Sequence, residues 1–177
     1  MARVVLALER EQQRLAGDVH PLLGPATINV GVIQGGVQVN FVPDVCVIEI
    51  DRRLLPGETV SGVLAHYQEI LDGLREQEPT LDAFMEPPML TDEALETSAD
   101  SAPAKLASAV LTGMGRVGTL CGVPFGSDAS KLARQGIPSL IIGPGSIDQA
   151  HGAVEFVEIA EVESAVHFYR EFIIGFE

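Results

Sequence analysis

The stretch from Gly126 to His151 constrains the fold of this chain more than any other segment. It opens with Ser127-Asp128, a pair that favours a helix start, and continues into the apolar run 139–142. The tight loop 143–146 (Gly-Pro-Gly-Ser) follows and leads to the histidine. In open α/β folds, ligands bind where the carboxyl ends of strands meet glycine-rich turns. The segment therefore predicts a helix, a buried strand and a functional loop near His151.

The front half of the chain predicts an α+β layer in which two helices cover a mainly antiparallel sheet. Hydrophobic periodicity and turn residues indicate, in order, a helix, two strands, a helix and a short strand: residues 1–17, 27–34, 45–54, 56–77 and 80–86. This α-β-β-α-β order is one strand short of the β-α-β-β-α-β arrangement. We therefore expect a missing first strand, truncation ahead of Met1 and a sheet edge that favours association.

A proline-rich acidic segment at residues 86–93 predicts a domain boundary, which divides the chain into 1–88 and 89–177. Beyond it, helices alternate with strands, which indicates an α/β layer. The expected helices and strands are 102–111, 117–120, 127 onward, 139–142 and 160–174. Two strands are too few for a stable sheet, so this part is expected to belong to a larger α/β domain.

Composition excludes several classes of function. The formal net charge of −14 repels phosphate backbones, so we expect no nucleic-acid partner. No apolar run is long enough to span a bilayer and no signal-peptide pattern is present, so no membrane partner is expected. Cys46 and Cys121 form no C-x-x-C motif and are interpreted as buried free thiols, with a disulfide as the alternative. A reducing cytoplasm is the expected location.

Two separated motifs resemble one enzyme family. The first is the loop 143–146 followed by His151 and Glu155; the second is Gly35-Gly-x-x-x-Asn40-x-Val-Pro followed by Asp51-x-Arg53. In this order they resemble the metal-dependent amidohydrolases and exopeptidases. That family includes acetylornithine deacetylase, succinyl-diaminopimelate desuccinylase, aminoacylase and glutamate carboxypeptidase (carboxypeptidase G). The resemblance implies a lid, or dimerisation, domain at 1–88 and the C-terminal part of a catalytic domain at 89–177.

The resemblance implies that His151 binds one of two zinc ions, with cobalt as an alternative metal. The run Gly152-Ala-Val-Glu155 keeps the family's glutamate spacing but lacks its Thr-Pro-Asn/Asp residues. Without this context, a lone histidine after a loop is more often a hydrogen-bonded surface residue. A catalytic zinc needs three protein ligands, and the other histidines form no metal-binding pair. The family's remaining ligands and general base would precede Met1, so we expect the isolated chain to be inactive.

Five residues are predicted to contact substrate. The resemblance assigns Asn40 and Arg53 to a substrate carboxylate or carbonyl oxygen, in some family members across the dimer, and a planar guanidinium suits a carboxylate. Otherwise Asn40 would cap a turn and Arg53 would be a charge at a strand edge. The neighbouring Arg52 should face the opposite side of the sheet. Backbone N–H groups of the 143–146 loop, at Gly143, Gly145 and Ser146, are candidates for a second substrate contact.

The predicted activity is therefore that of a fragment of a two-zinc hydrolase. Its substrates would be the amide bonds of N-acyl amino acids or small peptides, and it would form a homodimer. The tract from His20 to Glu58 looks closest to the deacetylase and desuccinylase branch. The alternative is a noncatalytic dimerisation or small-ligand-binding module of the same fold. An unrelated ferredoxin-like binder is a third interpretation, and it leaves the second half of the chain unexplained.

Overall fold

The computed structural model describes residues 1–150 and 152–176, which form two compact units. The first unit contains Met1–Ala94 and the short segment Gly122–Gly126. The second unit contains the other described residues, which are 95–121, 127–150 and 152–176. The lid and catalytic ranges expected from the sequence, 1–88 and 89–177, stay a prediction.

Helix α1 (Ala2–Leu15) opens the first unit and confirms the first predicted helix. Val4, Leu8 and Leu15 are buried along one stripe, while most of its charged residues face solvent. Two short strands, β1 (Val19–His20) and β2 (Gly24–Pro25), follow as a small antiparallel pair. Sequence patterns missed this pair, because two-residue strands show no periodicity.

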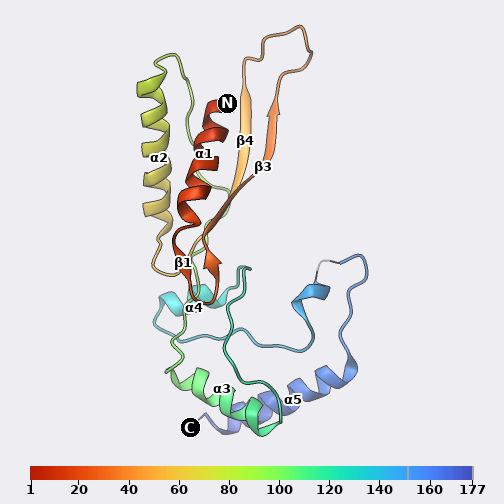
Figure 1. Ribbon diagram of the computed structural model, residues 1–177. Helices are drawn as coiled ribbons and strands as arrows, with labels where there is room; N and C mark the ends of the chain where they lie inside the picture. Colours follow the sequence, from red (N-terminus) through yellow and green to blue (C-terminus); the bar gives the residue numbers. More distant parts are fainter. Residues whose placement is uncertain (151, 177) are drawn as a thin grey trace. The chain divides into compact units, whose positions relative to one another are not determined.

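Strands β3 (Thr27–Gly35) and β4 (Cys46–Arg53) form a long antiparallel hairpin, close to the two predicted strands. The register shifts between Val30 and Val32, which leaves Gly31 as a bulge. Residues 36–45 connect the strands outside the regular ladder. Figure 1 shows the hairpin as the orange and tan strands beside α1.

Helix α2 (Val60–Gln77) begins at Thr59, whose hydroxyl accepts a hydrogen bond from the Gly62 amide. It packs against α1, which in turn packs against β3. The core of the first unit draws its buried apolar side chains from α1, β3, α2 and their connections: Val4, Leu8, Leu15, Ala26, Ile28, Leu55, Tyr67, Leu71 and Leu74. The predicted α+β lid architecture is thereby confirmed.

The second unit is helical in the residues described. Helix α3 (Ala102–Gly113) packs against α5 (Ile159–Ile174), and Ala104, Ala107 and Phe168 are buried in these two helices. Two shorter elements precede α5: the helix α4 (Ala129–Arg134) and the 3-10 turn η1 (Ile147–Gln149). The three helices predicted for this part of the chain are confirmed.

Three predicted strands are wrong. Residues 80–86, 117–120 and 139–142 form neither a helix nor a strand in the structure. Their apolar, β-prone side chains are suited to a sheet, but a strand exists only when its backbone pairs with a neighbour. Among the described residues, every strand pairs within β1–β2 or β3–β4, and these runs have no such neighbour.

Two expectations from composition can be compared with the structure. Both cysteines are free thiols, as expected, but they are not buried: Cys46 is half-buried and Cys121 is exposed. None of the helices in the described part of the chain combines the length and the apolar character needed to cross a membrane.

Candidate functional site

The structure places Asn40 and Arg53 at opposite ends of the β3–β4 hairpin. Asn40 is exposed in the loop between the strands, whereas Arg53 is the last residue of β4 and pairs with Thr27 at the start of β3. Seven residue steps separate Cys46 from Arg53, or about 24 Å of strand. The two residues therefore do not form one small binding site within a single copy of the chain.

Arg53 presents its guanidinium on the exposed side of the hairpin. Its side chain is 56% exposed, and its Nε donates a hydrogen bond of 2.8 Å to Asp51 Oδ2. Asp51 lies two residues away on the same face of β4. Among the described residues, Arg53 has no further side-chain hydrogen bond or ion pair, so its two terminal nitrogens are available to a ligand.

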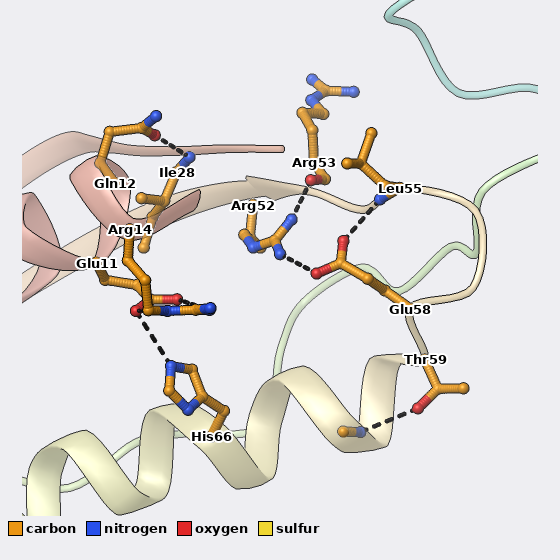
Figure 2. A network of polar contacts seen from close by, with 11 residues as sticks. Glu11, Gln12, Arg14, Ile28, Arg52, Arg53, Leu55, Glu58, Thr59 and His66 are labelled. Carbon is orange, nitrogen blue, oxygen red and sulfur yellow. Dashed lines mark hydrogen bonds and ion pairs between the residues drawn. The ribbon is translucent and has the colours of Figure 1, made fainter. Parts of the chain in front are cut away.

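Arg52 faces the opposite side of the sheet, as predicted, and its side chain is only 9% exposed. Its guanidinium forms an ion pair with Glu58 and donates a hydrogen bond to the Arg53 carbonyl oxygen. The second oxygen of Glu58 accepts a 2.7 Å hydrogen bond from the Leu55 amide. Figure 2 shows these three contacts side by side at the end of β4.

A second charged cluster joins α1 to α2. Glu11 is buried, and Arg14 donates two hydrogen bonds to its carboxylate, at 2.8 and 2.7 Å. His66 Nε2 lies 3.1 Å from Glu11 Oε2, the oxygen that also accepts from Arg14 Nε (Figure 2). The hydrogen bonds from Arg14, assisted by His66 and opposed by burial, lower the pKa of Glu11 below its usual value. The same contact with Glu11 raises the pKa of Arg14.

A cavity of about 300 Å³ lies between these two clusters, at the start of α2. Its lining combines both ion pairs with the turn before the helix: Glu11, Arg14, Arg52, Gly57, Glu58, Thr59, Gly62, Val63, His66 and Tyr67. Burial raises the pKa of the Tyr67 phenol, and the nearby Arg52 partly offsets this rise. The wall charges already neutralise one another, so the cavity does not select for an ion of either sign.

The predicted loop 143–146 borders a different cavity, of about 360 Å³, within the second unit. Gly145 and Ser146 line it together with Phe156, Val157 and residues of η1 and α5. Gly145 has φ of +83°, and an added Cβ would come 3.1 Å from Val157, so glycine suits this position. The Ser146 hydroxyl accepts a hydrogen bond from the Asp148 amide and thereby caps η1. Gly143 does not line this cavity.

His151 lies outside the described residues, so its role as a zinc ligand stays a prediction. Among the residues that are described, no group of three or more His, Cys, Asp or Glu side chains could hold a metal ion. A catalytic zinc requires three protein ligands and an open position. The described residues therefore do not form a zinc site by themselves.

Sequence reasoning missed the buried charges of the first unit. Glu11 and Arg14 stand three residues apart on a helix, a spacing that signals a contact. Pro56-Gly57 likewise signals a turn that brings Glu58 back toward β4. The contact between Glu11 and His66 has no such signal, because it depends on how two helices pack.

The hairpin and the two helices of the first unit lie in a region that matches a known domain. Residues 1–78 match the family model of the peptidase dimerisation domain. Two solved peptidases have the same fold over 97% of this chain and 44% of theirs. They are an aminopeptidase from Bacillus cereus (TM-score 0.70, 20% identity) and a tripeptidase from Staphylococcus aureus (TM-score 0.72, 21% identity).

Similarity to known sequences extends beyond the dimerisation domain. An acetylornithine deacetylase from Myxococcus xanthus is 30% identical over 136 residues, which are 77% of this chain and 34% of the relative. A putative succinyl-diaminopimelate desuccinylase from Mycobacterium tuberculosis is 29% identical over 145 residues (81% and 37%). A probable carboxypeptidase from Aspergillus clavatus is 30% identical over 155 residues (85% and 33%). The chain thus spans about a third of the length of these relatives. Residues 1–78 thus belong to the peptidase dimerisation domain family, and the chain is similar to acetylornithine deacetylases, desuccinylases and related carboxypeptidases.

Proposed function

We propose that the chain supplies the dimerisation domain and part of the catalytic domain of a hydrolase that cleaves amide bonds in N-acyl amino acids or small peptides. The similarity to the acetylornithine deacetylase of Myxococcus xanthus carries this proposal. Its 136 matched residues are more than the first unit contains (Met1–Ala94 and Gly122–Gly126), so the similarity includes part of the second unit. The peptidase fold of the two structural neighbours is compatible with the same proposal.

The proposal assigns substrate contacts to Arg53, Asn40 and the loop 143–146. Arg53 would bind a substrate carboxylate, and its exposed terminal nitrogens support that role. Asn40 stands at the other end of the hairpin, so one small substrate would not touch both residues of one protomer. A homodimer removes this difficulty, because the hairpin loop of one protomer can approach a site on its partner. Backbone N–H groups at Gly143, Gly145 and Ser146 would make a separate contact.

The proposed metal is zinc, as two ions with cobalt as an alternative, and His151 would bind one of them. Zinc would supply Lewis-acid polarisation of the substrate carbonyl and an activated water. The described residues contain no metal cluster, so the remaining ligands are not assigned. We place the protein in the cytoplasm, where its two cysteines would remain reduced.

The test is a chimera that joins the N-terminal segment of the Myxococcus xanthus enzyme to this chain. The chimera should hydrolyse N-acetylornithine. Replacing Arg53 with Ala should raise KM about tenfold to a hundredfold, because a carboxylate contact holds ground and transition states alike. His151→Ala should instead remove metal and abolish kcat. Arg10→Ala is the control, since Arg10 is exposed and its Nε donates to the Leu6 carbonyl oxygen of its own helix. An unchanged KM in Arg53→Ala would show that Arg53 does not bind the substrate and is an ordinary surface residue.

The 177 residues alone should show no turnover, since a single predicted ligand does not hold a catalytic zinc. Zinc-dependent hydrolysis by the purified chain, abolished by a chelator and by His151→Ala, would contradict this expectation. A folded, dimeric chimera without activity would favour the alternative, a noncatalytic dimerisation or small-ligand-binding module.

A further inference from the structure

We propose that Arg52 and Glu58 are positioning residues that hold Arg53 in place, an inference that rests on the proposed role of Arg53 as a carboxylate contact. The three residues surround the end of β4, where the chain leaves the sheet and turns toward α2. Nothing in the ladder fixes the chain beyond Arg53, because its pairing with Thr27 is the last of the hairpin. The end of a two-stranded ladder frays unless other contacts restrain it.

Two hydrogen bonds between Leu55 and Glu58 close the turn after Arg53. The Glu58 amide donates a 3.1 Å hydrogen bond to the Leu55 carbonyl, and the Leu55 amide donates one of 2.7 Å to Glu58 Oε2. Pro56 and Gly57 stand between them, and Gly57 has φ of +90°, as a type II turn requires. The buried side chain of Leu55 anchors this turn in the core.

Arg52 links that turn to the backbone of Arg53. Its guanidinium holds the other Glu58 oxygen and also donates to the Arg53 carbonyl oxygen. The Arg52 side chain is 9% exposed and that of Glu58 is 29% exposed, so solvent screens this pair less than an exposed one. The backbone of Arg53 is therefore held from the buried face of the hairpin, while its side chain projects from the other face.

Asp51 completes the support by orienting the side chain. It accepts the hydrogen bond from Arg53 Nε, which leaves the two terminal nitrogens as the free donors. A carboxylate would then approach Arg53 end-on, through these two nitrogens. The contact between Asp51 and Arg53 is exposed on both sides, so it contributes less than the buried pair behind it.

The experiment uses the full 177-residue chain labelled with ¹⁵N, and N-acetylglycine as the probe. N-acetylglycinamide, which lacks the carboxylate, serves as the control ligand. In Glu58→Gln we expect faster hydrogen exchange at the Leu55 amide. The order parameter of the Arg53 amide should fall from about 0.85 toward 0.6. The dissociation constant for N-acetylglycine, followed at Arg53 Nε, should rise about threefold to tenfold, because a loosened side chain must be ordered on binding.

Arg52→Lys tests the other member of the pair. Lysine keeps the charge, but it lacks the planar guanidinium that lets Arg52 contact both Glu58 and the Arg53 carbonyl oxygen. Glu76→Gln removes the same charge from an exposed position on α2 and should change none of these readouts. A merely structural role would lower the melting temperature and loosen amides throughout the unit. The positioning role predicts changes confined to residues 52–58.

Two results separate this inference from the proposed function. Unchanged order at Arg53 and unchanged affinity in both Glu58→Gln and Arg52→Lys would overturn the positioning role. If N-acetylglycine shifts no Arg53 signal in the parent chain, the carboxylate role of Arg53 fails. In that case, the order parameter of the Arg53 amide in Glu58→Gln and Arg52→Lys, measured without ligand, still decides whether Arg52 and Glu58 hold Arg53 in place.

Discussion

At the residue scale, charged partners from two helices surround the buried carboxylate of Glu11. It accepts two hydrogen bonds from Arg14 on its own helix and lies beside His66 of α2. Its lowered pKa means that the ionised form is stabilised in the folded state. This contribution is therefore fully present above the pKa that Glu11 has in the unfolded chain, about 4.3, and is lost as pH falls through its lower folded-state pKa.

Replacing Glu11 with Gln should lower the free energy of unfolding by about 1–2 kcal/mol at pH 7, since the charge-assisted hydrogen bonds are weakened. The loss should shrink as pH falls below the pKa of Glu11 in the unfolded chain, about 4.3, and should vanish below its lower folded-state pKa. Urea denaturation at a series of pH values measures both effects. Glu9→Gln, an exposed change on the same helix, is the control. A loss that stays constant down to low pH would show that packing, rather than charge, is responsible.

At the element scale, the N-cap residues of α2 and α3 differ in whether their hydroxyl forms a capping hydrogen bond. Thr59 caps α2 through a hydrogen bond of 3.1 Å from the Gly62 amide. Ser101 occupies the corresponding position of α3 but makes no such bond, and its hydroxyl is buried with no hydrogen-bond partner among the described residues. Both residues carry a hydroxyl that could cap a helix. Local geometry alone decides that Thr59 stabilises its helix start whereas Ser101 does not.

We expect Thr59→Ala to lower the free energy of unfolding by about 1 kcal/mol and to speed hydrogen exchange at Gly62. Ser101→Ala should be neutral or stabilising, because it removes an unsatisfied buried hydroxyl. Thermal unfolding and amide exchange of both variants test the contrast. Equal destabilisation by both substitutions would mean that the cap hydrogen bond of Thr59 contributes nothing specific.

At the scale of the whole molecule, the β3–β4 hairpin of the first unit has sheet edges that no other strand of the described residues pairs with. The β3–β4 hairpin has only two strands, and its connecting loop exposes several large apolar side chains: Val37, Val39, Phe41, Val42 and Val45. Open strand edges and exposed apolar patches both favour association. Together with the match to the peptidase dimerisation domain, they support a homodimer formed through the first unit.

Sedimentation velocity over a range of protein concentrations should therefore show a dimer that dissociates on dilution. Val42→Asp, which places a charge in the exposed loop, should shift the equilibrium toward the monomer. Val154→Asp, at another exposed valine, is the matched control and should leave it unchanged. A monomer at every concentration would contradict the proposed dimer.

The helices α1, α2, α3 and α5 and the β3–β4 hairpin were predictable from sequence, because their signals are local. Hydrophobic spacing marks a helix, alternation marks a strand, and the Pro56-Gly57 turn marks where the second strand ends. Motif order also pointed to a dimerisation domain and to acetylornithine deacetylases, which the comparisons likewise find similar. The opposite orientations of Arg52 and Arg53 follow from the two-residue period of a strand, and the structure confirms them.

Contacts between distant residues were decided only by tertiary structure. The runs 80–86, 117–120 and 139–142 have strand-like composition, yet a strand needs a partner backbone that composition does not specify. Motif order likewise grouped Asn40 with Arg53, whereas the length of the hairpin separates them. The pairing of Glu11 with His66 depends on helix packing, and so does its lowered pKa. Local patterns thus determine elements, while the meeting of side chains depends on how those elements pack.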